Sequence, residues 1–228
     1  MAPVETGRAG PEQFLQLIRR QARGRLKVYL GSSAGVGKTY AMLREGHRLK
    51  QQGLDVAIGL VETHGRSETA EQIGDLELIA PRSIEYRGVV LNEMDVDAVL
   101  KRRPTVCLVD ELAHTNAPGS RHAKRYQDVD DLRRAGIHVI TTVNIQHLES
   151  LYDEVERATG VKVKERLPDS VLAEADQIVN VDLPAEDLLE RLKAGKVYPP
   201  ERVERALANF FTAPKLTRLR ELTLTEVA

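Results

Sequence analysis

A glycine-rich turn, residues 31–39, lies between an apolar run and a segment with helical spacing. It reads Gly31-Ser32-Ser33-Ala34-Gly35-Val36-Gly37-Lys38-Thr39. Small residues let successive backbone N–H groups point inward, and the N-terminus of the following helix adds a partial positive charge. The pattern is typical of a polyphosphate-binding loop, in which Lys38 reaches the β- and γ-phosphates and the Thr39 hydroxyl binds Mg²⁺.

The loop departs from the usual template at its first position. The template has glycine, four residues and then Gly-Lys-Ser/Thr, which places Ser32 first and Gly31 one residue too early. We expect either an unstrained φ angle at Ser32 or a tight turn at Gly31. The alternative is a chance glycine loop before a helix, but the flanking strand and helix favour a phosphate site. We predict that ATP is bound by residues 31–40, Tyr40 included.

Composition narrows the class of protein. The chain has 228 residues, of which 42% are hydrophobic and 29% charged, which suits one large globular α/β domain. A net charge of −1 gives no indication of a nucleic-acid surface, and no apolar stretch approaches the ~20 residues of a membrane span. The single Cys107 lies in an apolar run, as expected of a buried thiol in a reducing compartment. We expect a cytoplasmic chain with disordered residues 1–10.

Short β-branched runs alternate with helical patterns along most of the chain, which predicts a parallel sheet covered on both faces. Strands are predicted at 26–30, 55–61, about 83–87, 105–109, 138–143 and 177–181. Helices are predicted at 38–52, 68–74, 96–102, 124–135 and 146–159, and residues 75–92 leave room for a hairpin. We therefore expect a P-loop NTPase-like α/β domain over residues 11–183. Residues 184–228 form a helical extension that either packs on this core or leads to a further domain.

Two acids end the apolar run 106–109. A carboxylate at the tip of a buried strand beside the phosphate loop can hold Mg²⁺ and its water shell, and Asp110 is the candidate. Glu111 then lies where a base orients a water or hydroxyl for in-line attack. Taken alone, the Asp-Glu pair is more typical of a strand cap, but the upstream loop favours a metal site.

Three further segments are candidates for the same crevice. Residues 112–126 contain the cations Arg121, Lys124 and Arg125, which either neutralise charge on a transferred phosphoryl group or belong to a solvated loop. We take Arg121 as the catalytic candidate. Asn144 follows a predicted strand, where it either senses the γ-phosphate or caps a helix. Residues 62–66 follow another strand and can line the crevice.

Residues 31–39, 109–122, 141–150 and 195–198 together resemble the N-terminal cytoplasmic domain of the KdpD family of potassium-responsive sensor histidine kinases. The similarity extends from about residue 25 to residue 222, with Ala123 and Ser33-Ala34 as departures from the family pattern. It implies an ATP-binding regulatory domain of a two-component system, joined to the remainder of a sensor kinase. It also implies a potassium pump subunit as a conceivable acceptor for serine phosphorylation.

Three classes of function stay open from the sequence. The domain is a slow ATPase or switch, a protein serine kinase that uses Lys38, Glu111 and Arg121, or an ATP sensor without turnover. Glu111 beside Asp110 favours chemistry over binding alone. The sequence contains no histidine kinase core and no segment for membrane insertion, so we expect no autophosphorylation on histidine.

Overall fold

The computed structural model describes residues 22–227, so the predicted disorder of residues 1–10 lies outside the described part. Its main element is a six-stranded sheet with the strand order β3-β2-β6-β7-β1-β8, in which every neighbouring pair is parallel. The strands are β1 (Leu26–Gly31), β2 (Val56–Leu60), β3 (Glu77–Leu78), β6 (Val106–Val109), β7 (His138–Asn144) and β8 (Gln177–Val181). The predicted α/β fold with a mostly parallel sheet is confirmed.

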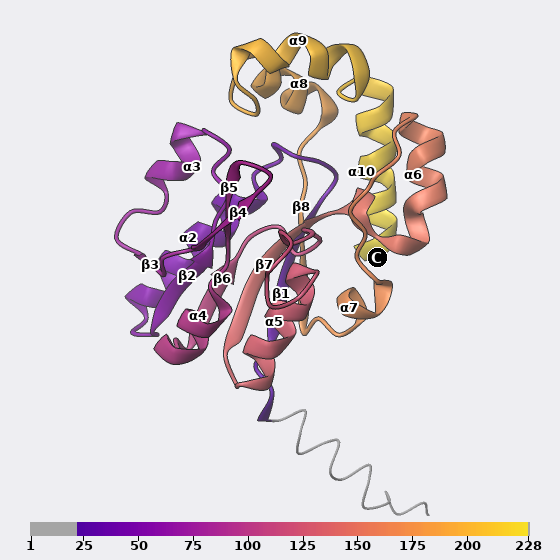
Figure 1. Ribbon diagram of the computed structural model, residues 1–228. Coiled ribbons are helices and arrows are strands. Elements are labelled where there is room, and N and C mark those ends of the chain that lie inside the picture. The colour runs from indigo at the N-terminus through magenta and orange to yellow at the C-terminus, as the bar shows by residue number, and fades with distance from the viewer. Residues whose placement is uncertain (1–21, 228) are drawn as a thin grey trace, which may run out of the picture.

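Helices cover both faces of this sheet, as Figure 1 shows. On one face, α2 (Lys38–Gln51) packs Met42 and Leu43 against strands β2, β6 and β7. The other face is covered by α4 (Val96–Arg102), α5 (Arg125–Arg134), α6 (Tyr152–Thr159) and α7 (Asp169–Ala173). Since both faces are covered, the strands read as continuous apolar runs rather than as alternating patterns.

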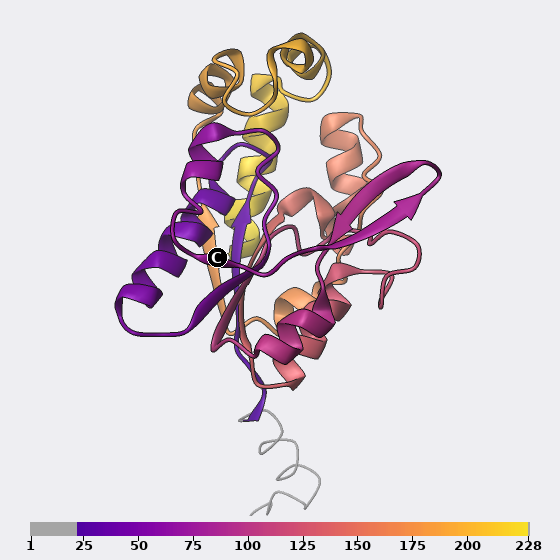
Figure 2. The same cartoon turned by 60° about the vertical axis from the view of Figure 1, so that its left-hand side comes forward.

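Residues 82–93 do not join the main sheet. They form an antiparallel hairpin of β4 (Arg82–Tyr86) and β5 (Val89–Glu93), which projects from the body of the molecule in Figure 2. Its turn has positive φ angles at Arg87 (52°) and Gly88 (78°), the conformation that suits a two-residue hairpin connection. The predicted strand at 83–87 therefore exists, but it pairs with its sequence neighbour and not with the parallel sheet.

The predicted helix over 146–159 is correct only in its second half. Two 3₁₀ turns, η1 (Ile145–His147) and η2 (Glu149–Leu151), precede α6. Leu148 between them is extended, and its neighbours exchange backbone hydrogen bonds with Leu167, from Glu149 N–H at 3.1 Å and to His147 C=O at 2.7 Å. These long-range bonds replace the first turns of the helix.

The last helices close the carboxyl end of the sheet. They are α8 (Ala185–Lys193), α9 (Pro200–Asn209) and α10 (Ala213–Val227). The C-terminal extension packs on the glycine-rich turn, where Val36 contacts a cluster that contains Leu188, Leu192 and Val197. Helix α10 contributes Leu219 and Leu222 to the main core. A short helix, α3 (Ser67–Glu71), follows β2 on the same side (Figure 1).

Candidate functional site

The glycine-rich turn connects β1 directly to α2. Gly35 and Gly37 have φ angles of 91° and 103°, in the left-handed region where side chains are disfavoured. At Gly31 the constraint is space, because a Cβ there would lie 2.7 Å from a methyl carbon of Val36. Ser32 is buried and is not among the residues with positive φ. Close packing inside the turn therefore requires glycine at position 31, one residue before the first position of the template.

Lys38 lies at the start of α2 with its side chain inside the turn. The residue is 8% exposed, and its ammonium donates a 2.8 Å hydrogen bond to the Ser33 carbonyl. Burial lowers the pKa of Lys38 to about 8. Among residues 22–227, no carboxylate lies within ion-pair distance of this ammonium. A buried cation that bonds only a neutral carbonyl is suited to receive an anion.

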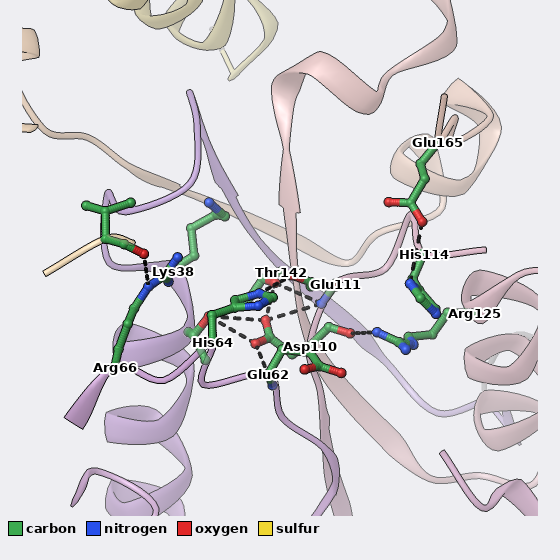
Figure 3. Close-up of polar contacts among 12 residues, drawn as sticks. Lys38, Glu62, His64, Arg66, Asp110, Glu111, His114, Arg125, Thr142 and Glu165 are labelled. Carbon is green, nitrogen blue, oxygen red and sulfur yellow. Dashed lines mark hydrogen bonds and ion pairs between the residues drawn. The ribbon is translucent and has the colours of Figure 1, made fainter. Parts of the chain in front are cut away.

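Asp110 lies next to the turn because β6 and β1 end at the same edge of the sheet (Figure 3). Its carboxylate accepts hydrogen bonds from the Thr39 hydroxyl at 3.0 Å, from the Thr142 hydroxyl and from the backbone N–H of Glu62. Burial raises the pKa of Asp110, and the bond from Thr142 partly offsets this. The predicted pair of Thr39 and Asp110 is thus brought together by the fold.

The oxygens of Thr39 and Asp110 are the kind of ligand that Mg²⁺ prefers. Within the described residues, no group of three or more His, Cys, Asp or Glu side chains is placed to hold a metal ion. A cation beside Asp110 would therefore complete its shell with water and phosphate oxygens, as Mg²⁺ does in nucleotide sites. The residues present fit that arrangement.

Glu111 follows Asp110 with a φ of 56°, which is unusual for a residue other than glycine. Its N–H donates to the Thr142 hydroxyl at 3.1 Å, and its carboxylate accepts from His64 Nε2 at 2.7 Å. Burial raises the pKa of Glu111, but the bond from His64 outweighs it and holds the pKa below the usual range. The same bond raises the pKa of His64.

These residues line one cavity of about 340 Å³. The predicted residues Tyr40 and Asn144 lie in its wall, and the side-chain amide oxygen Oδ1 of Asn144 is buried without a partner in the described part of the chain. Strand β7 lies between β1 and β6, and Asn144 at its end pairs with Gly31 of β1. The other cations of the wall are Arg66, Arg191 and Lys196, of which the last two belong to the C-terminal extension.

The three predicted cations of residues 112–126 lie outside this wall. Arg121 pairs with Asp97 at 2.6 Å and Asp131 at 3.0 Å, and the Lys124 ammonium donates to the Thr115 hydroxyl. Arg125 is 1% exposed and donates to the Asp110 carbonyl at 3.1 Å. The fold therefore brings none of the three ammonium or guanidinium groups into the cavity.

A second polar network lies beside the cavity. Glu93, at the end of β5, accepts from Arg125 at 3.2 Å and from His114 at 3.0 Å. His114 also pairs with Glu165 at 3.4 Å, and both line the cavity (Figure 3). Sequence reasoning missed Glu93 and Glu165, since neither follows a strand of the main sheet or belongs to a motif.

No helix among residues 22–227 is both long and apolar enough to cross a bilayer. The chain also has no disulfide partner for Cys107, which lies buried in β6. Burial raises the pKa of this thiol to about 12, so Cys107 is an unreactive core residue.

Comparison with known proteins identifies relatives over nearly the whole chain. The sensor protein KdpD of Escherichia coli K12 is 52% identical over 221 residues, covering 97% of this chain and 25% of that protein. KdpD of Mycobacterium tuberculosis H37Rv is 55% identical over 89% of this chain and 24% of its own length. A putative sensor protein KdpD of Synechocystis is 54% identical over 90% of this chain and 56% of its own. The chain thus spans about a quarter of the first two relatives.

Among solved structures, the Pif1 helicase from Candida albicans matches 89% of this chain and 47% of its own, with 17% identity and a TM-score of 0.38. This likeness is too weak to support a functional comparison. The family model described as the osmosensitive K⁺ channel His kinase sensor domain, KdpD, matches residues 22–228. The chain therefore belongs to the KdpD family, whose sensor-domain model matches it from residue 22 onward.

Proposed function

We propose that this KdpD domain binds MgATP in the cavity at the carboxyl edge of the sheet. The observation that carries the proposal is the Lys38 ammonium, which is buried inside the glycine-rich turn and, among the described residues, bonded only to the Ser33 carbonyl. Such a group loses hydration on folding, and an anionic phosphate restores the lost interaction energy. The cavity of about 340 Å³ lies in the size range of small-molecule sites.

Each part of the cavity then has a role toward a triphosphate. The N–H groups of residues 35–39 and the N-terminus of α2 face the phosphates, and Lys38 contacts their outer oxygens. Thr39 and Asp110 hold Mg²⁺, which neutralises charge between the outer phosphates when it is bound. Asn144, with a buried oxygen lacking a partner, orients water or magnesium ligands near the terminal phosphate.

We propose further that nucleotide binding regulates the remainder of a sensor histidine kinase on the cytoplasmic side of the membrane. Turnover, if chemistry follows binding, is slow phosphoryl transfer in which Glu111 orients the attacking oxygen. That oxygen belongs to water in an ATPase, or to a serine of a potassium pump subunit in a protein kinase. Catalysis would then rest on positioning and electrostatics from Lys38, Asp110 and Glu111.

A second candidate is a domain that senses ATP without consuming it. The bond between His64 and Glu111, at 2.7 Å, favours this candidate, since it occupies the carboxylate that would orient a nucleophile. Labelled γ-phosphate separates the possibilities: it stays on ATP for a sensor, appears as phosphate for an ATPase, and moves to serine for a kinase.

Calorimetric titration with MgATP tests the binding proposal. We expect Lys38→Ala to weaken binding by about 1.5–3 kcal/mol, the range for hydrogen bonds to charged groups. Asp110→Asn should make binding insensitive to Mg²⁺, whereas Glu111→Gln should leave binding near normal and lower any turnover. Unchanged affinity in folded Lys38→Ala protein would refute the site.

A further inference from the structure

The cavity wall contains four Lys and Arg side chains, and they fall into two classes. Lys196 pairs with Glu68 at 2.8 Å, and Arg191 approaches the same carboxylate at 3.7 Å. Lys38 and Arg66 form no ion pair with the described residues, and each donates to a main-chain carbonyl. Lys38 and Arg66 therefore have no carboxylate partner among the described residues. The glycine-rich turn accounts for an unpaired cation at Lys38, but it does not account for one at Arg66.

Arg66 lies in the connection between β2 and α3 and lines the same cavity as that turn. Its Nε donates to the Val197 carbonyl at 3.0 Å, and the other nitrogens of the half-buried guanidinium have no partner among the described residues. Figure 3 shows its side chain on the same side of the site as Lys38. A guanidinium carries five N–H donors, so most of the donors of Arg66 have no partner among the described residues and are available to a ligand in the cavity.

Electrostatics place Arg66 within range of both the lysine and the acids. Burial is the main cause of the lowered pKa of Lys38, and the positive charge of Arg66 lowers it further. Burial lowers the pKa of Arg66, and the negative charges of Asp110 and Glu111 offset part of this effect. Arg66 also lines the same cavity as Thr39 and Asp110, which are placed to hold Mg²⁺, and the terminal phosphate of a bound triphosphate would lie beside that ion.

We propose that Arg66 binds the terminal phosphate of a nucleoside triphosphate and makes the domain discriminate ATP from ADP. The inference rests on the proposed MgATP site. The turn and Lys38 suffice for the inner phosphates, which both nucleotides share, whereas Arg66 has a ligand only when a third phosphate is present. A planar guanidinium suits this task because it can donate two parallel hydrogen bonds to one phosphate.

The test compares two affinities in the 228-residue chain. Calorimetry measures binding of Mg²⁺ with ADP and with a non-hydrolysable ATP analogue, for the parent chain and for Arg66→Gln, Arg66→Lys and Arg44→Gln. Arg44 is the matched control because it is exposed on α2 and forms no ion pair with the described residues. Thermal melting confirms that each variant is folded. If Arg66→Gln does not fold, Arg66→Lys still tests the proposal, because it keeps the charge and removes the paired donors.

We expect Arg66→Gln to lower the affinity for the ATP analogue roughly ten-fold or more, and the affinity for ADP by no more than about two-fold. Arg66→Lys should fall between Arg66→Gln and the parent chain, because it retains charge but not the paired donors, and Arg44→Gln should match the parent. Equal losses for both nucleotides would overturn the assignment and leave Arg66 as the partner of Val197. If the parent chain binds neither nucleotide, the proposed MgATP function fails instead, and the assignment with it.

Discussion

Cations on the two sides of Asp110 are treated differently by the fold. On the side of the glycine-rich turn, Lys38 and Arg66 donate to main-chain carbonyls and have no carboxylate within ion-pair distance among the described residues. On the other side, Arg125 pairs with Glu93, and Arg121 pairs with Asp97 and Asp131. Carboxylates of the described residues therefore neutralise the charges of Arg125 and Arg121, but not those of Lys38 and Arg66.

This difference separates side chains that stabilise the chain from those available to a ligand. A cation paired with carboxylates can leave that pair only if another partner replaces the lost interaction. A cation bonded to a carbonyl keeps its full charge for an incoming anion. Position near a predicted magnesium ligand is therefore a weaker guide to function than the partner that each cation already has.

The largest effect is expected from breaking the buried pair. Arg125→Met leaves Glu93 without its guanidinium partner in a site where the Glu93 side chain is 7% exposed. We expect a loss of about 3 kcal/mol in the free energy of unfolding, measured by urea denaturation, because the buried carboxylate loses its guanidinium partner and keeps only His114 and a backbone N–H. Lys38→Met is the matched variant on the other side, and its unfolding free energy should stay equal or rise. Similar losses in both variants would remove the distinction.

A smaller effect, dependent on pH, is expected at His114. Burial lowers the pKa of His114, but the bonds to Glu165 and Glu93 outweigh it and raise the pKa to about 9. A pKa raised by folding stabilises the native state below the unfolded value of about 6.5 and loses that contribution as pH rises through the folded value. His114→Gln should therefore cost about 1–3 kcal/mol near pH 6 and much less near pH 10. A constant difference across this range would show that His114 contributes by packing.

The smallest effect is expected at Arg121. Its side chain is 44% exposed and its partner Asp97 is 75% exposed, so Arg121→Gln should change the unfolding free energy by less than about 1 kcal/mol. Its position outside the cavity wall leads us to expect unchanged MgATP affinity by calorimetry. A clear loss of nucleotide affinity or turnover would show instead that residues 112–126 move to the cavity, and the two sides would no longer differ.

Local patterns predicted the elements that carry the site. The strand at 177–181 was predicted with the bounds of β8, because its β-branched residues Ile178, Val179 and Val181 favour a strand locally. The meeting of Thr39 and Asp110 also follows from the sequence, since parallel strands bring their carboxyl ends to one edge.

Long-range partners could not be predicted in the same way. The bond from Arg66 to Val197 joins residues 131 positions apart, and that between His114 and Glu93 spans 21 positions that include α4 and β6. Within residues 112–126, only the three-dimensional course of the loop decides that Arg125 turns inward and Arg121 outward. A one-dimensional pattern specifies residue types at a crevice but not which of several like charges faces it.

The contact between Gly35 and the C-terminal extension has a mechanical consequence. A Cβ at Gly35 would lie 2.6 Å from a methyl carbon of Val197, so the turn has one surface toward the cavity and the other against α8 and the residues after it. Transient opening of the extension must uncover the turn as well, and amide hydrogens of both segments then exchange with solvent in a single cooperative event. Any ligand that holds the turn closed should therefore slow exchange in α9 and α10 as well, although neither helix lines the cavity.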